Sequence, residues 1–267
     1  MSKNRLLTHY SPGLITYDQL GLLFFHPFKS ILMHHNNKQR KRLRLAITGP
    51  VSAPKLFTAL QLAYGLTGAW DRIIVIGNSP KDNLYHHLGS YHVLSVSKGA
   101  SPQRYADLLN LCSGCNKDAV IFSTFADEWR EGVGSSVQTG YHEEALRGHR
   151  LLFEMIRHSQ VHVIVCIDSK KKLLYQSGER HPKIRIGYAP IQEEGFERHL
   201  TSVLALDKKG MAKVEKDTTK VLPAEIVFKP SVQTGALLQD WCYEGCPLIS
   251  LEMQHRIDRC TNLAQLY

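Results

Sequence analysis

The sequence contains, at residues 43–56, the stretch LRLAITGPVSAPKL, in which an apolar run passes through a turn rich in glycine and proline into a segment of helical periodicity. The run Leu43–Ile47 predicts a strand that ends at Thr48-Gly49-Pro50. Apolar residues spaced three and four positions apart predict a helix over residues 55–66. A strand, a loop and a helix in this order are the unit from which parallel sheets are built, so the stretch indicates the α/β class.

The same alternation continues along the chain. Short runs of β-branched and other apolar residues predict further buried strands, with helical segments between them. After Lys170 the expected strands are joined by short turns, which indicates antiparallel pairing. The predicted strands are residues 43–47, 72–76, 91–96, 118–122, 161–167, 200–206, 212–215 and 226–229; the predicted helices are 55–66, 101–111, 143–158 and a pair within 248–267; residues 180–191 are polar and carry no predicted strand. We therefore expect an α/β fold with a mostly parallel sheet flanked by helices and antiparallel strands added at one edge.

Length and composition are those of a folded protein. The chain has 267 residues, of which 43% are hydrophobic and 21% charged, and this excludes a disordered protein. No apolar run approaches the ~18 residues of a transmembrane helix, and the N-terminus lacks the residue order of a secretory signal. We expect a cytoplasmic protein without a membrane partner.

Positive charge is in excess, and much of it is local. Lys and Arg outnumber Asp and Glu by 33 to 24, a net charge of +9 that favours a polyanionic partner such as DNA. Five of the basic residues lie close together within residues 38–44. Such a run is typical of a nucleic-acid contact and also of a solvated edge, and the sequence leaves both interpretations open. The five basic residues of the run are Lys38, Arg40, Lys41, Arg42 and Arg44.

The six cysteines give only a weak metal signal. Cys112 and Cys115 form one CxxC pair, and Cys242 and Cys246 form a looser pair with one more residue between them. A four-cysteine zinc site is an alternative, but a lone CxxC is weak evidence for it. We expect reduced cysteines and assign no metal site, and Cys166 is expected in the core.

The turn after the first predicted strand is compared with a phosphate-binding loop, G-x-x-x-x-G-K-[ST], in which backbone N–H groups and a lysine hold phosphates and a hydroxyl reaches Mg²⁺. Gly49 and Lys55 keep the required separation. Pro54 replaces the second glycine and Leu56 replaces the hydroxyl residue. Proline has no N–H to donate and leucine cannot bind Mg²⁺, so the loop departs from the pattern at two of its four defining positions.

Beyond this loop, a series of sequence blocks over residues 43–245 resembles the phage-associated AAA domain family of RecA-like P-loop ATPases. The blocks are residues 49–68, 72–76, 84–89, 101–105, 120–129, 164–170, 215–218 and 235–245. The resemblance implies a RecA-like P-loop NTPase domain over 43–247, preceded by a basic and apolar extension, 1–42, and followed by a helical segment, 248–267. It also implies ATP as the ligand and a homo-oligomer or related ATPase subunits as partners. The residues that it places at the nucleotide are Gly49, Pro50, Ser52 and Lys55.

The chain departs from this family at three further places. Ser123-Thr124 stand where the family has an aspartate that holds the metal, and Thr218 stands where it has an arginine. Asp168 puts a carboxylate where the family has a polar or basic residue. Asp127 and Glu128 remain as candidate catalytic carboxylates. Together with the altered loop, these losses predict a pseudo-ATPase that binds ATP weakly or not at all, without Mg²⁺, and that has an accessory role in the DNA metabolism of a phage or mobile element.

Two alternatives stay open. One is an active ATPase of DNA recombination or replication, with a non-standard metal site built from Ser123, Asp127 and Glu128. The other is a DNA-binding module without nucleotide, in which the basic run at 38–44 contacts phosphate.

Overall fold

Parallel strands built from the short apolar runs form the core of the computed structural model, which describes residues 40–133, 142–176 and 183–244. The sheet order is β3-β2-β4-β5-β1-β7-β8, and every neighbouring pair from β3 to β7 is parallel. The parallel strands are β1 (Arg44–Gly49), β2 (Ile73–Gly77), β3 (His92–Ser95), β4 (Ala119–Phe122), β5 (His162–Gln176) and β7 (Ser202–Leu206). The described residues belong to one compact unit.

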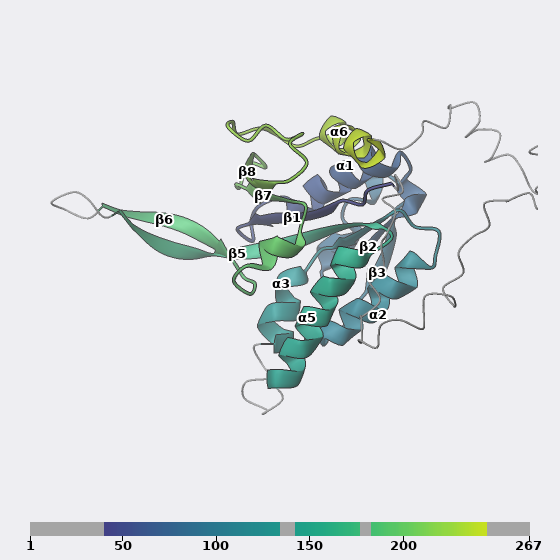
Figure 1. Ribbon diagram of the computed structural model, residues 1–267, viewed down its shortest axis with the longest axis horizontal. Coiled ribbons are helices and arrows are strands. Elements are labelled where there is room, and N and C mark those ends of the chain that lie inside the picture. The colour runs from purple at the N-terminus through teal and green to yellow at the C-terminus, as the bar shows by residue number, and fades with distance from the viewer. Residues whose placement is uncertain (1–39, 134–141, 177–182, 245–267) are drawn as a thin grey trace, which may run out of the picture. The chain divides into compact units, whose positions relative to one another are not determined.

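Two antiparallel strands complete the sheet. β8 (Ala212–Asp217) pairs with β7 at the edge. β6 (Lys183–Pro190) pairs with the second half of β5, and the resulting ribbon extends away from the parallel strands (Figure 1). The sequence had indicated no strand in this polar region, and that expectation is wrong. Pairing with an extension of β5 outside the parallel sheet supplies the backbone hydrogen bonds of β6 without requiring a continuous apolar run.

Helices cover both faces of the sheet (Figure 1). α1 (Lys55–Thr67) and α6 (Val232–Tyr243) pack on one face, and α2 (Pro102–Ser113) and α5 (His142–His158) pack on the other. On the second face α3 (Phe125–Asp127) runs into a π-helical turn, Glu128–Val133. Short 3-10 turns lie at Trp70–Arg72, Pro80–Asn83, His86–Leu88 and Phe196–His199.

The structure confirms the α/β class, the mostly parallel sheet flanked by helices and an antiparallel edge strand. The strand predicted at 226–229 is wrong: only Phe228 forms a bridge, with Ala212. Ile226 and Val227 are exposed, and Pro230, which has no N–H, directly precedes Ser231, the N-cap of α6. The helix pair predicted within 248–267 and residues 1–39 of the predicted extension 1–42 lie outside the described residues.

The parallel strands set the position of the candidate site. Because β1, β2, β4 and β5 run in the same direction, the loops that follow Gly49, Gly77 and Phe122 open at one edge of the sheet, beside Asp168. Ligands of open α/β sheets bind in the crevice outside these carboxyl ends. The loop at 48–54 therefore lies at the edge where such a fold binds ligands.

Candidate functional site

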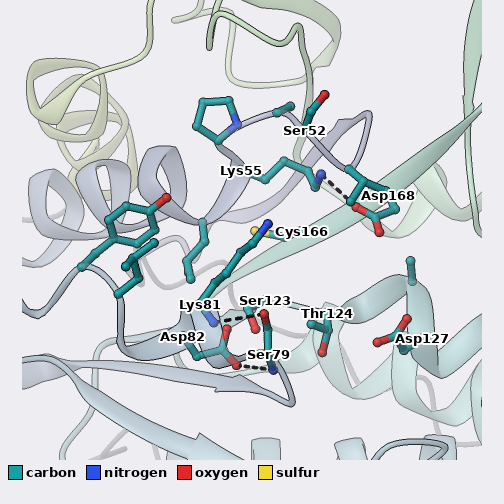
Figure 2. A pocket seen from close by; sticks show the side chains of 17 residues that line it. Ser52, Lys55, Ser79, Lys81, Asp82, Ser123, Thr124, Asp127, Cys166 and Asp168 are labelled. Atoms are coloured by element: carbon teal, nitrogen blue, oxygen red, sulfur yellow. Dashed lines mark hydrogen bonds and ion pairs between the residues drawn. The ribbon is translucent and has the colours of Figure 1, made fainter.

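A cavity of about 370 Å³ opens at the carboxyl ends of β1, β2, β4 and β5 (Figure 2). It is large enough for a small ligand, since such sites usually measure about 300–1,000 Å³. Ser52 and Lys55 lie on one wall, and Asp127 lies on the opposite wall with Ser123 and Thr124. Its other lining residues are Val51, Ala53, Pro54, Leu56, Ser79, Lys81, Asp82, Leu84, Tyr85, Ala126, Cys166 and Asp168.

The loop from β1 to α1 uses two of its backbone N–H groups for hydrogen bonds within the loop itself. Ala53 N donates to Pro50 O over 2.9 Å. Pro54, at φ −79° and ψ 55°, is the centre of an inverse γ-turn, in which Lys55 N donates to Ala53 O over 2.8 Å. A phosphate-binding loop needs these N–H groups directed at the anion. Here Pro54 has none, and those of Ala53 and Lys55 are already bonded within the loop.

The Lys55 ammonium is also satisfied internally. It is buried, and its Nζ lies 2.9 Å from Asp168 Oδ1, 2.8 Å from Pro50 O and 3.4 Å from Gly49 O. An ammonium has three donors, and these three oxygens can accept all of them. Lys55 is therefore bonded to a carboxylate in the position where a phosphate-binding lysine would bind phosphate (Figure 2).

Sheet register explains why Asp168 reaches Lys55. Gly49 at the end of β1 is paired with Asp168 on the parallel neighbour β5, so the carboxylate lies directly beside the start of the loop. Gly49 itself is required by close packing, because a Cβ at this position would lie 2.6 Å from Leu206 O. The first position of the loop and the ion pair are thus both fixed by the strands that flank β1.

Asp168 and Asp127 are linked by a more exposed cation. Arg130 Nη2 lies 3.9 Å from Asp168 Oδ2, and Arg130 Nη1 lies 3.9 Å from Asp127 Oδ1. Asn78 Nδ2 donates to Asp127 Oδ2 over 3.3 Å. Asp127, one of the two predicted catalytic residues, does line the cavity, but it is held by these two side chains.

Glu128, the other predicted catalytic residue, does not line this cavity. Its carboxylate is fully buried, and the Nδ1 atom of the equally buried His149 lies 2.9 and 3.1 Å from its two oxygens. Glu193 Oε2 lies 3.6 Å from His149 Nε2. The structure therefore brings Ser123 and Asp127 together but places Glu128 in the packing between the π-helical turn and α5.

Asp82 is a cavity residue that the sequence analysis missed. It is 2% exposed; Ser79 N donates to its Oδ2 over 3.0 Å, and the turn after β2 is closed by a capping box. Burial raises the pKa of Asp82, while the Ser123 hydroxyl and the Ser79 N–H oppose the rise. The Ser123 hydroxyl lies beside the Asp82 carboxylate, but among the described residues neither Asp82 Oδ1 nor Ser123 Oγ is in hydrogen-bond geometry with a partner. The signal available in the sequence was Ser79-Pro-Lys-Asp82, a capping pattern directly after a predicted strand.

The predicted nucleic-acid residues lie at the opposite edge of the sheet, at the start of β1, and most are engaged within the chain. Arg44 donates to Ile156 O and Ser159 O, at the end of α5, and to Arg42 O. Lys41 pairs with Glu244 over 3.1 Å, and Arg40 lies over the Tyr243 ring. Arg42 is half-buried, and burial together with neighbouring Arg40 lowers its pKa. Lys38 lies outside the described residues.

Among the described cysteines, the CxxC pair and Cys242 do not come together at one site. Cys112 on α2 and Cys242 on α6 belong to the cores on opposite faces, and Cys246 lies outside the described residues. Cys166 is buried in the cavity wall, and burial raises its pKa to about 12, which makes it an unreactive thiol at neutral pH. Among the residues that the structure describes, no three His, Cys, Asp or Glu side chains are grouped as metal ligands.

No model of a known protein family matches this chain, and no curated protein matches it significantly. Within residues 40–133, 142–176 and 183–244, none of the helices is both long enough and apolar enough to cross a membrane.

Proposed function

We propose that this chain is a RecA-like, P-loop-derived domain that does not hydrolyse ATP and serves as an accessory protein in DNA metabolism, as its resemblance to phage-associated AAA domains implies. The observation that carries the proposal is the ion pair between Lys55 and Asp168. The strand order supports descent from a P-loop ATPase. One strand, β5, lies between β1 and β4, so the loop after β1 and Ser123-Thr124 after β4 are close enough to line the same cavity.

The residues present do not fit a metal-chelated triphosphate in this arrangement. A phosphate at Lys55 has to displace the Asp168 carboxylate, and the displaced carboxylate then faces a second anion. Separating one partner from a buried ion pair costs about 3–5 kcal/mol, and somewhat less here because Asp168 is partly exposed. Since about 1.4 kcal/mol is a tenfold change in affinity, this cost weakens triphosphate binding by about tenfold to a hundredfold.

The direct test is turnover. Purified protein is incubated with ATP and Mg²⁺, phosphate release is measured, and Lys55→Ala is assayed in parallel. We expect no release above that of the variant. Turnover that disappears in Lys55→Ala would overturn the proposal. Calorimetry with ATP, ADP and a non-hydrolysable analogue, each with and without Mg²⁺, then measures whether any nucleotide is held.

A second candidate, an active ATPase with a non-standard metal site, is favoured by one observation: the Asp82 carboxylate lies beside Ser123 in the same cavity as Asp127. Mg²⁺ is commonly bound through one or two carboxylates plus the phosphates of its substrate. This candidate predicts turnover that is lost in Asp82→Asn. Glu128 has no part in it, because Glu128 is paired with His149 away from the cavity.

A further inference from the structure

A second cavity, of about 510 Å³, lies between the base of the β5–β6 ribbon and the β7–β8 turn. We call it the ribbon groove. Gly49 and Pro50 of the loop line it, but it has no lining residue in common with the cavity beside Lys55. Its lining residues are Thr48, Gly49, Pro50, Ser169, Tyr188, Pro190, Ala205, Leu206, Asp207, Lys208, Lys209, Met211, Lys213, Glu215 and Val227.

The floor of the ribbon groove is apolar and presents an aromatic ring to solvent. Tyr188 on β6 is 46% exposed and Val227 is 57% exposed. Met211 and Leu206 line the groove with them. An open groove that offers an aromatic ring beside aliphatic side chains can stack a planar, unpaired group such as a nucleobase.

The rim of the groove is basic. Lys208, Lys209 and Lys213 line it and are exposed, and Lys171 is paired across the ribbon with Tyr188. Lys209 also lines a smaller adjoining cavity of about 200 Å³ that includes Lys229. Three lysines therefore line this cavity, and a fourth lines the cavity beside it.

Two carboxylates, of Asp207 and Glu215, also line the groove, and three lysines outnumber them. Asp207 Oδ1 accepts the backbone N–H groups of Lys209 and Met211, which shapes the turn. Burial and the nearby Glu197 raise the pKa of Glu215, and the nearby Lys213 opposes that rise. Among the described residues, Lys208 and Lys209 form no ion pair, whereas the basic run at the start of β1 is largely engaged.

We propose that the ribbon groove binds single-stranded nucleic acid, with a base stacked on Tyr188 and phosphates on Lys208, Lys209 and Lys213. Aromatic platforms beside a positively charged groove are the usual means of binding single strands, and a paired base in a duplex offers no free face to such a ring. The site is independent of nucleotide binding at Lys55. Its success or failure therefore leaves the pseudo-ATPase proposal untouched.

The test uses the full chain without nucleotide and a fluorescein-labelled 20-residue oligothymidine, with binding followed by anisotropy over a range of salt concentrations. Each phosphate contact contributes about 0.7 to the slope of log affinity against log salt for a single strand. Changing Lys208, Lys209 and Lys213 to glutamate should therefore lower the slope by about 2 and weaken binding at low salt. The matched control changes three exposed arginines on α2 and α5, Arg104, Arg147 and Arg150, to glutamate and should bind like the wild type.

Stacking is tested at Tyr188. Replacing an aromatic side chain that stacks on a base by alanine lowers affinity by about fivefold or more. Tyr188→Ala should therefore weaken binding by at least that factor, whereas Tyr188→Phe should not. Thermal unfolding and a glutamine version of the lysine triple variant exclude misfolding as the cause. Any one of three results overturns the proposal: no binding at low salt, an equal loss in the arginine control, or equal affinity for a duplex together with no effect of Tyr188→Ala. Binding of polyglutamate in preference to the oligonucleotide would assign the groove to an acidic protein instead.

Discussion

Asp168→Asn should have two opposite consequences, a less stable protein and a better anion site. In the wild type, Asp168 Oδ1 lies 2.9 Å from Lys55 Nζ. The asparagine keeps an oxygen at this position but removes the negative charge that compensates the buried ammonium. Hydrogen bonds between charged groups contribute about 1.5–3 kcal/mol, and we expect a loss of about 2 kcal/mol because Asp168 is partly exposed. For a chain of this size that corresponds to a fall in Tm of roughly 4–8 °C.

The same variant should recover affinity for phosphate. With the competing carboxylate gone, ATP or inorganic tripolyphosphate no longer has to displace a charge from Lys55, and affinity should rise by about tenfold to a hundredfold over the wild type. Differential scanning fluorimetry measures both effects, since a ligand that binds only the native state raises Tm. Calorimetry then gives the dissociation constants.

Asp127→Asn is the matched control for this experiment. It makes the same change of charge in the same cavity, but Asp127 contacts Arg130 and Asn78 rather than Lys55. We expect it to change neither Tm by more than about 2 °C nor phosphate affinity by more than a few fold. If Asp168→Asn is as stable as the wild type and binds tripolyphosphate no better, the ion pair does not restrain Lys55 and the reasoning fails.

Four further outcomes follow from the structure. Pro54→Gly with Leu56→Thr should raise ATP affinity measurably by calorimetry, and more so in combination with Asp168→Asn, whereas no gain in the triple variant would contradict a phosphate-loop ancestry. Glu128→Gln should lower Tm by several degrees through its buried contact with His149, and a loss of ATP turnover at unchanged Tm would instead make Glu128 catalytic. Gly65→Ala should destabilise the protein by about 1–3 kcal/mol in urea unfolding, because a Cβ there collides with Val232 O on α6, while Gly114→Ala, whose nearest neighbour would be 3.6 Å away, should change it little. Burial, with Arg40, Arg42 and Arg44, lowers the pKa of His162 from 6.5 to about 3, so below pH 6.5 the unfolded state takes up a proton that the folded state excludes. The free energy of unfolding should therefore fall as pH drops from about 6.5 toward 3, by on the order of 3 kcal/mol at pH 4. A His162→Asn variant whose stability has the same pH profile as the wild type would refute this.

Much of the fold could be predicted from the sequence because its parallel strands are buried on both faces. Such strands are continuous apolar runs, and 72–76, 118–122 and 161–167 were all predicted within one or two residues of β2, β4 and the sheet portion of β5. β6 escaped prediction because the ribbon lies beyond the parallel sheet and needs no apolar run. The strand predicted at 226–229 shows the converse error, since Ile226 and Val227 are β-branched or apolar yet exposed.

The site could be predicted only in part, because its key contacts join residues distant in sequence. The altered loop and Ser123 were visible as departures from a pattern, and Asp127 was visible as a carboxylate a few residues beyond a predicted strand. That Asp168 contacts Lys55 follows from the pairing of Gly49 with Asp168, and no local pattern contains the register of two strands more than 100 residues apart. Arg44 was misleading for the same reason: a run of basic residues does not reveal that one of them bonds the carbonyls at the end of a helix.

The departures in the loop are better explained as one alternative packing than as separate losses. Pro54 is the centre of the γ-turn and lies close to Gly210, where an added Cβ would be 3.1 Å from the proline ring. Leu56, one residue beyond Lys55, belongs to the core on the α1 face and gives the cavity an apolar side chain in place of a hydroxyl. Each of the three residues replaces something that a phosphate loop offers to its ligand. Pro54 directs the Lys55 N–H to Ala53 O, Leu56 puts an apolar side chain where a hydroxyl would be, and Asp168 binds the Lys55 ammonium. A loop stabilised in this way without phosphate has little to gain from binding one. On the proposed phosphate-loop ancestry, Pro54→Gly, Leu56→Thr or Asp168→Asn alone should therefore give little affinity, and the three changes together should give more than the sum of their separate effects.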